Sequence, residues 1–305
     1  MTAAASGPSR GALRAEAALL ANTVIWGATF VLVKAALMNI STLLFLAIRF
    51  SIATAALLAL FRGFHKNIRG WKPLGAGALT GTFLFSGYLF QTFGLRLTTA
   101  PKSAFITGLS AVMVPMLAAL VYRSRPKVSE VAGVLLATAG LALMTLEGRV
   151  PSGAGSVGRG DILTFFCAIG FAAHIVTLGH FSEHVSFELL SVGQVGAAAL
   201  WALSLFWWVE TPRLRWRPAL VYAILVTGFL ATALAFTVQA WAQQYTTATR
   251  TALIYMLEPV FAWATSYAWM GEGLSARAAA GAGLILGGVL MAELKPWKQR
   301  PHPNQ

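Results

Sequence analysis

Long apolar stretches separated by short polar connectors make up almost the whole chain. Each stretch has about 18–25 residues, enough for a helix rising ~1.5 Å per residue to cross a hydrocarbon core of ~30 Å. The stretches are continuously apolar, whereas the strands of a membrane barrel would alternate. The predicted spans are 15–36, 42–61, 74–95, 103–122, 129–146, 161–179, 187–209, 219–243, 251–270 and 277–294. This pattern predicts an all-α integral membrane protein with ten transmembrane helices.

Composition agrees with this class, because 57% of the residues are hydrophobic and only 11% are charged. A soluble domain would carry about 25% charged residues. The net charge of +13 is dispersed over short loops, which is typical of membrane orientation and not of a nucleic-acid partner. We therefore expect a lipid bilayer as a partner. No cofactor is indicated: Cys167 is the single cysteine and the glycine-rich stretch 153–160 lacks the Lys-Ser/Thr of a phosphate loop.

Charge bias between connectors predicts the orientation. In the first half, Lys and Arg gather in the connectors that lie on the same side of the membrane as the N-terminus. This bias places the N-terminus in the cytoplasm. The second half shows the opposite bias, through Arg213, Arg215 and Arg217. We follow the first half, because early spans usually dominate. An even number of spans then places both termini on the cytoplasmic face of the inner membrane, and we interpret the first apolar run as a span and not as a cleaved signal.

Two parts of the chain resemble each other at a constant shift of 148 positions. Gln91 then matches Gln239, and Gly140 matches Gly288, whereas Pro115 and Pro259 differ by 144. Each half would hold five spans, and because five is odd the second half would enter the membrane inverted. The fold class predicted is therefore two inverted five-helix repeats. The expected divisions are a tail 1–14, a first repeat 15–146, a connector 147–160, a second repeat 161–294 and a tail 295–305.

Several short motifs occur in the order and spacing of a known family. They are Trp26-Gly27-Ala28-Thr29-Phe30, Arg49-Phe50, the stretch 99–107, and Leu257-Glu258-Pro259-Val260. With these motifs the chain resembles the EamA-type exporters of the drug/metabolite transporter superfamily, over about residues 17 to 294. The resemblance implies a secondary transporter of small metabolites, often an exporter, with a central pocket between the repeats.

Three ionisable residues lie deep within the spans: Arg49, His174 and Glu258. Charge at membrane depth is costly and usually functional. Glu258 could bind a cationic substrate group, exchange a proton, or fix helix packing, and Pro259 after it should bend the helix. Arg49 could pair with Glu258, neutralise a substrate carboxylate, or reach the interface. His174 is either a packing residue or part of a proton relay.

Other polar and aromatic residues complete the predicted site. Neutral amides at equivalent positions suit a zwitterionic or polyhydroxyl ligand. Nearby rings could form pocket walls, or they could contact lipid or pack against other helices. The predicted binding residues are Trp26, Tyr88, Gln91, Gln239, Tyr255 and Glu258, with Trp241 as a further wall. Family resemblance and symmetry suggest Lys102 and Arg250 as a gate, with interfacial anchoring as the alternative.

These features favour a secondary active transporter that exports small polar metabolites such as amino acids, with proton coupling as an open question. A membrane-embedded enzyme would need paired acid and base groups or metal ligands at one depth, and a non-transporting subunit is the third alternative. We therefore expect no enzyme and no metal. The sequence indicates no particular oligomeric state.

Overall fold

The computed structural model describes residues 10–64, 70–98, 100–123, 127–145, 158–270 and 275–293. Helices dominate these ranges, and within them the β-structure is one isolated antiparallel bridge between Ile40 and Leu214. The helices are α1 (Arg10–Ala36), α2 (Thr42–Leu60), α3 (Lys72–Leu97), α4 (Ala100–Gly108), α5 (Ser110–Tyr122), α6 (Val128–Thr145), α7 (Arg159–Ser182), α8 (Phe187–Leu205), α9 (Pro218–Gly228), the π-helix η2 (Phe229–Leu234), α10 (Ala235–Ala242), α11 (Ala248–Tyr255), α12 (Glu258–Met270) and α13 (Ala276–Glu293).

Helix occupies each of the ten ranges predicted to span a membrane. Six segments are long and apolar enough to do so by length and composition, and two shorter apolar helices accompany them, Val128–Leu143 and Ala276–Met291. The six are Arg10–Ala36, Thr42–Leu60, Phe105–Tyr122, Arg159–Ser182, Phe187–Leu205 and Pro218–Ala242. Helix α3 is equally long but less apolar, because it carries polar residues such as Thr80 and Thr92 that are buried inside the protein.

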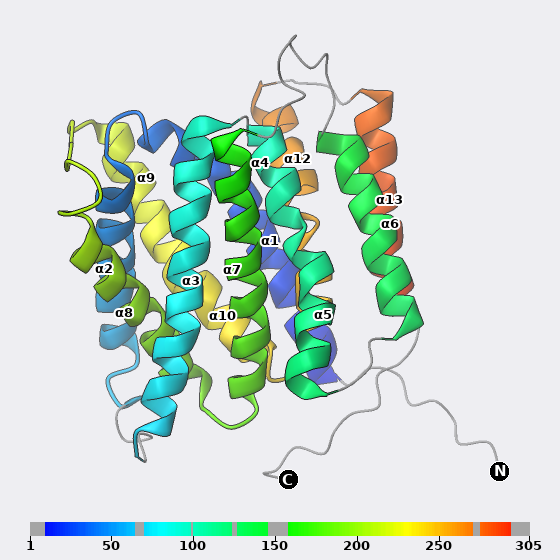
Figure 1. The fold of residues 1–305 in the computed structure, drawn as a ribbon, viewed down its shortest axis with the longest axis horizontal. Coiled ribbons are helices and arrows are strands. Elements are labelled where there is room, and N and C mark those ends of the chain that lie inside the picture. Colours follow the sequence, from blue (N-terminus) through cyan, green and yellow to red (C-terminus); the bar gives the residue numbers. More distant parts are fainter. Residues whose placement is uncertain are drawn as a thin grey trace.

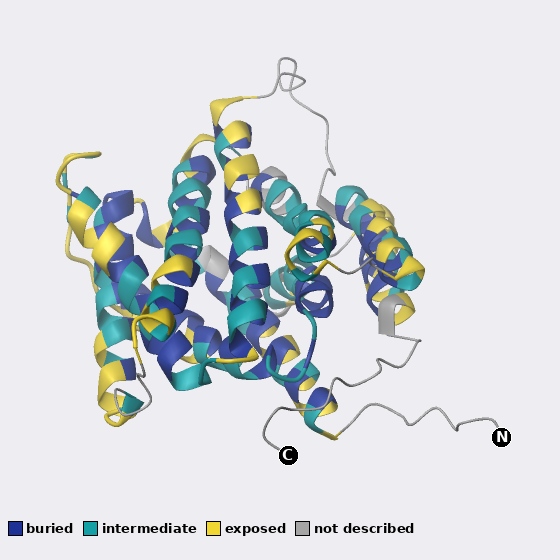
Figure 2. Ribbon diagram, turned by 60° about the horizontal axis from the view of Figure 1, so that its bottom comes forward, coloured by how far each residue is buried: buried dark blue, intermediate teal, exposed yellow. Residues whose placement is uncertain are grey.

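The helices lie roughly side by side (Figure 1), with buried residues facing the interior and exposed ones facing outward (Figure 2). Large apolar side chains are exposed on the outer faces, for example Leu200 on α8 and Leu120 on α5. Lipid would solvate such faces, whereas water would not. The protein therefore has the surface of a membrane protein.

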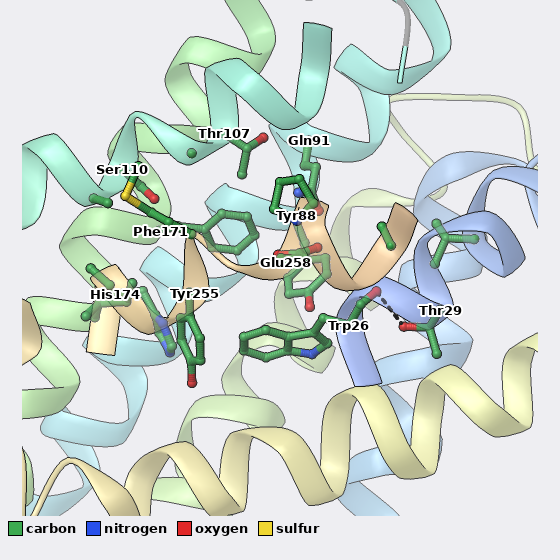
Figure 3. A pocket seen from close by; sticks show the side chains of 18 of the residues that line it. Trp26, Thr29, Tyr88, Gln91, Thr107, Ser110, Phe171, His174, Tyr255 and Glu258 are labelled. Atoms are coloured by element: carbon green, nitrogen blue, oxygen red, sulfur yellow. Dashed lines mark hydrogen bonds between the residues drawn. The ribbon is translucent and has the colours of Figure 1, made fainter. Parts of the chain in front are cut away.

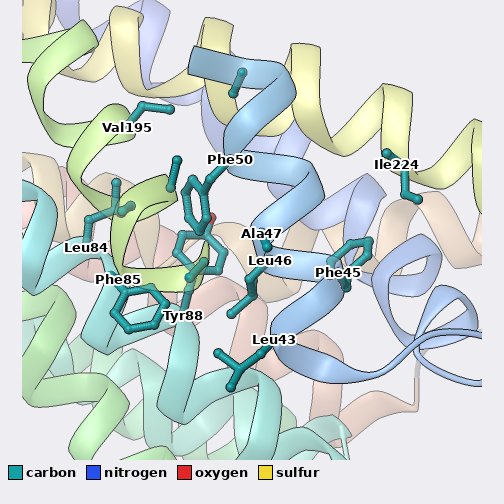
Figure 4. Close-up of a cluster of buried hydrophobic side chains, with 14 of the residues drawn as sticks. Leu43, Phe45, Leu46, Ala47, Phe50, Leu84, Phe85, Tyr88, Val195 and Ile224 are labelled. Carbon is teal, nitrogen blue, oxygen red and sulfur yellow. The ribbon is translucent and has the colours of Figure 1, made fainter. Parts of the chain in front are cut away.

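The interior contains two large hydrophobic clusters, each built from both predicted repeats. The first includes Leu43 and Leu84 from the N-terminal part and Val195 and Ile224 from the C-terminal part (Figure 4). The second joins α5 and α6 to α7, α11, α12 and α13. The halves 15–146 and 161–294 are therefore not separate packing units. A rocking motion of one complete half against the other would break both clusters.

Helices α6 and α13 make the most extensive contact between two helices (Figure 1). Gly140 lies against the backbone of Gly281 and Ile285, and Gly288 lies against the backbone of Gly133. Since Gly133 is near Gly288 and Gly140 is near Gly281, the two helices are antiparallel. Small residues permit this close backbone approach.

Candidate functional site

A cavity of about 160 Å³ lies between the two hydrophobic clusters. One water molecule needs only ~10–15 Å³ on a comparable measure, so the cavity has room for a small organic molecule. Its lining includes all of the residues predicted to bind substrate and the three ionisable residues predicted at membrane depth. These are Trp26, Arg49, Tyr88, Gln91, His174, Gln239, Tyr255 and Glu258. Figure 3 labels most of these side chains.

Two interrupted helices border this cavity. The break between α4 and α5 falls at Leu109, and the break between α11 and α12 falls at Met256 and Leu257. Leu109 and Leu257 are 148 positions apart, which is the shift of the internal repeat. Pro259 removes one backbone donor at the second break, as expected. Pro115, in contrast, lies inside α5 and not at the first break. The two helix breaks therefore still correspond at a shift of 148 positions, although Pro115 and Pro259 are 144 positions apart.

Arg49 is buried and is held by neutral groups. Its Nε donates to Thr232 Oγ1 at 2.6 Å, and its Nη2 donates to Tyr88 Oη and to the carbonyl oxygen of Ala231, both at 3.2 Å. The guanidinium carbon also lies 4.7 Å from the centre of the Tyr88 ring. The possible ion pair between Arg49 and Glu258 is absent from the ion pairs of the described residues.

The acceptors for Arg49 come from the π-helix η2, which the sequence did not predict. Thr232 Oγ1 donates to the carbonyl of Thr227, five residues earlier, at 2.8 Å. The carbonyl of Ala231 also accepts from Trp26 Nε1 at 2.9 Å. A π-helix offsets backbone carbonyls from the regular α-helical pattern, and such segments often occur at functional sites. Here it turns oxygen atoms of the second repeat toward Arg49 of the first.

Glu258 is the first residue of α12 and has no hydrogen bond or ion pair among the described residues. The N-terminus of a helix stabilises negative charge. In Figure 3 the side chains labelled around Glu258 include Trp26, Tyr88 and Tyr255. The rings of Trp26 and Tyr255 pack edge to face, with centres 4.8 Å apart. The carboxylate therefore lies in a cavity with aromatic walls.

His174 and the glutamines form a hydrogen-bonded group beside the cavity. A ring nitrogen of His174, Nε2, lies 2.7 Å from Gln194 Oε1, and Gln194 Nε2 donates to the carbonyl of Phe236 at 3.4 Å. Gln239 Nε2 donates to Gln243 Oε1 at 3.3 Å, which leaves Gln239 Oε1 buried and without a partner in the described part. His174 thus has the contacts of a packing residue.

Of the two predicted gate residues, Lys102 and Arg250, the structure describes the side chain of Arg250. The side chain of Lys102 lies outside the described residues. Arg250 is buried, and its Nη1 lies 2.7 Å from Glu16 Oε1 in an ion pair between α11 and α1. Leu19 and Ile254 belong to a small hydrophobic cluster on the same two helices. The ion pair therefore joins α1 to α11.

Other residues at the site were not predicted, and for Trp241 the alternative of helix packing holds. Phe171 and Phe236 line the cavity and contact Tyr88, with ring centres 5.3 and 6.1 Å apart. Trp241 does not line it, because it packs against Tyr245. Within the described residues, no three His, Cys, Asp or Glu side chains converge to hold a metal ion.

An all-helical fold with a lipid-compatible surface and charged residues around an internal cavity is typical of membrane transport proteins. The sequence profile of the EamA-like transporter family matches residues 13–146 and again residues 158–294. The chain therefore belongs to the EamA-like transporter family.

Comparisons with individual proteins agree. An uncharacterized transporter of Archaeoglobus fulgidus is 36% identical over 284 residues, covering 93% of this chain and 87% of that protein. The uncharacterized transporter YetK of Bacillus subtilis is 27% identical over 226 residues, covering 70% of this chain and 68% of that protein. A crystal structure with 19% identity superposes with a TM-score of 0.76, covering 92% of this chain and 97% of that chain. The last comparison concerns the fold alone.

Proposed function

We propose that this protein is a secondary active transporter that exports small polar metabolites, such as amino acids, across the cytoplasmic membrane by alternating access. The observation that carries the proposal is the cavity between the two clusters, lined by a buried cation, Arg49, and a carboxylate, Glu258, that do not pair with each other. A buried charge is expensive unless something neutralises it. A polar molecule with charged groups of both signs would do so.

Three observations support the proposal of an inverted duplication. The family profile matches the chain twice. The helix breaks at Leu109 and Leu257 are separated by the repeat shift. Helices α6 and α13, which correspond in the two repeats, meet in an antiparallel and symmetric contact. Antiparallel contact between equivalent helices is what an axis in the membrane plane requires.

We further propose that the moving bodies are the two mixed clusters and not the two sequence halves. Opening and closing the space between them would leave each hydrophobic core intact, and the interrupted helices beside the cavity provide places to bend. With the N-terminus in the cytoplasm, the Glu16–Arg250 ion pair closes the cytoplasmic side in this conformation. Breaking that pair would be part of the transition that admits substrate from inside.

Purified protein in liposomes tests this function. Counterflow or efflux of labelled amino acids is measured with and without a proton gradient. We expect saturable transport, and we expect Glu258→Gln to change its gradient dependence if that carboxyl carries the proton. Glu183→Gln serves as the matched control, because Glu183 is exposed at the end of α7. Lack of transport for every small polar metabolite tested, with correctly inserted protein, would contradict the proposal.

A further inference from the structure

The two charged groups of the cavity differ in what the protein already offers them. Arg49 uses two of its three guanidinium nitrogens for three oxygen acceptors and lies over the ring of Tyr88. Glu258 makes no hydrogen bond or ion pair with the described residues. Glu258 faces the cavity and is withdrawn from bulk water. Since a charged group in such a place is costly without a partner, the group that still needs a partner is the carboxylate.

The surroundings of Glu258 define the kind of partner. Trp26, Tyr88 and Tyr255 line the same cavity, and Figure 3 shows them around the carboxylate. The faces of electron-rich rings attract ammonium groups, and a carboxylate adds a full negative charge to that attraction. An anion placed beside Glu258 would be repelled by the carboxylate and by the ring faces.

The rest of the lining is mostly apolar. Val33, Leu95 and Ile175 border the cavity together with Phe171 and Phe236. Such walls favour an apolar body attached to the charged nitrogen, in a molecule small enough for about 160 Å³. Ligand sites of this kind combine apolar walls with a few polar groups that fix orientation.

We propose that Glu258 and the rings of Trp26 and Tyr255 form a site for a protonated amine, so that the substrate class is small amines with an apolar group, with or without a carboxylate. This inference rests on the proposed transport function and narrows its substrate. Arg49 is then mainly a positioning residue: it orients Tyr88 and joins the first repeat to the π-helix.

Binding to the full-length protein in detergent at neutral pH tests the inference with three probes that share one phenyl ring. Phenethylamine carries only the ammonium group, 3-phenylpropanoate carries only the carboxylate, and phenylalanine carries both. Affinity is measured by calorimetry. We expect phenethylamine to bind about as tightly as phenylalanine, and 3-phenylpropanoate to bind about tenfold more weakly or worse.

Glu258→Gln should weaken phenethylamine binding by about tenfold or more, and it should not weaken the binding of 3-phenylpropanoate. Tyr255→Leu is a second variant that keeps the carboxylate and removes one ring; it should weaken the amine selectively, whereas Tyr255→Phe should retain binding. Tighter binding of 3-phenylpropanoate than of phenethylamine, or no binding of the amine, would overturn the inference.

The two proposals fail in different ways. Selective binding of amines without any movement of amines or amino acids in liposomes would contradict the transport function and leave the amine site standing. Transport of amino acids whose binding depends on the carboxylate group of the substrate would support the transport function and contradict the amine site. In that case Arg49, and not Glu258, would be the principal group that holds the substrate.

Discussion

Gly140 and Gly288 hold α6 and α13 together at equivalent places, so replacing either with alanine should destabilise the protein by a similar amount. A Cβ atom at Gly140 would lie 2.5 Å from the carbonyl oxygen of Gly281, and one at Gly288 would lie 2.5 Å from that of Gly133. Both obstacles are backbone atoms, which cannot turn aside as a side chain can. The helices would have to separate.

The magnitude follows from comparison with Gly283→Ala on α13, where an added Cβ has nothing within 4 Å. Glycine to alanine within a helix favours folding by about 0.8–1.0 kcal/mol, and this gain is common to all three variants. Overpacking typically costs about 1–3 kcal/mol. Gly140→Ala and Gly288→Ala should therefore each be about 1–3 kcal/mol less stable than Gly283→Ala.

Thermal unfolding in detergent measures this difference. At about 2–4 °C per kcal/mol, the midpoints should lie roughly 2–12 °C below that of Gly283→Ala. Equal midpoints for all three variants would refute the close backbone contact. A large effect at only one of Gly140 and Gly288 would refute the symmetric packing, and with it one support for the inverted repeat.

Three further predictions concern the cavity and its closed end. Gly27→Ala would place a Cβ 2.8 Å from the backbone of α12. Transport should therefore fall and the melting temperature should drop. Unchanged values would contradict the contact of α1 with α12. Thr232→Val removes the hydroxyl that accepts from Arg49 and should cost about 1.5–3 kcal/mol in thermal unfolding; a neutral result would mean that the π-helix does not hold Arg49. Arg250→Gln should destabilise by about 3 kcal/mol or more by leaving Glu16 buried and unpaired, and adding Glu16→Gln should recover part of the loss. If the double variant is as unstable as the single one, the ion pair does not couple α1 to α11.

The positions of the helices could be predicted because apolar run length is a strong signal in membrane proteins. The ends agree within a few residues for most helices; for example, 42–61 was predicted and α2 covers Thr42–Leu60. The break before Glu258 was also foreseeable, because Pro259 cannot donate a backbone hydrogen bond. The break at Leu109 could not be foreseen, because no proline marks it and Pro115 lies within a regular helix.

The site was predictable to the extent that its residues are polar. Gln91 and Glu258 are conspicuous in apolar spans, and the structure brings both to the cavity. Phe171 and Phe236 gave no signal, because a ring that faces a cavity and a ring that faces lipid look alike in a sequence. The π-helix was equally hidden: its residues, Phe229–Leu234, read as ordinary apolar helix. Its role depends on which carbonyls face Arg49, and that is a property of the assembled helices.

The proposed duplication explains why the cavity exists, and the differences between equivalent residues explain what it can hold. At the repeat shift of 148 positions, Arg49 of α2 corresponds to Ala197 of α8. Ser110 begins α5, and Glu258, 148 positions later, begins α12. At each pair one repeat supplies a charged group and the other a neutral one. A perfectly symmetric cavity would accept a polar molecule in two orientations equally, whereas this arrangement places one cation and one carboxylate at non-equivalent points. A molecule bound to Glu258 through its amine therefore has one preferred orientation, and a movement of the clusters would carry it in that orientation from one side to the other.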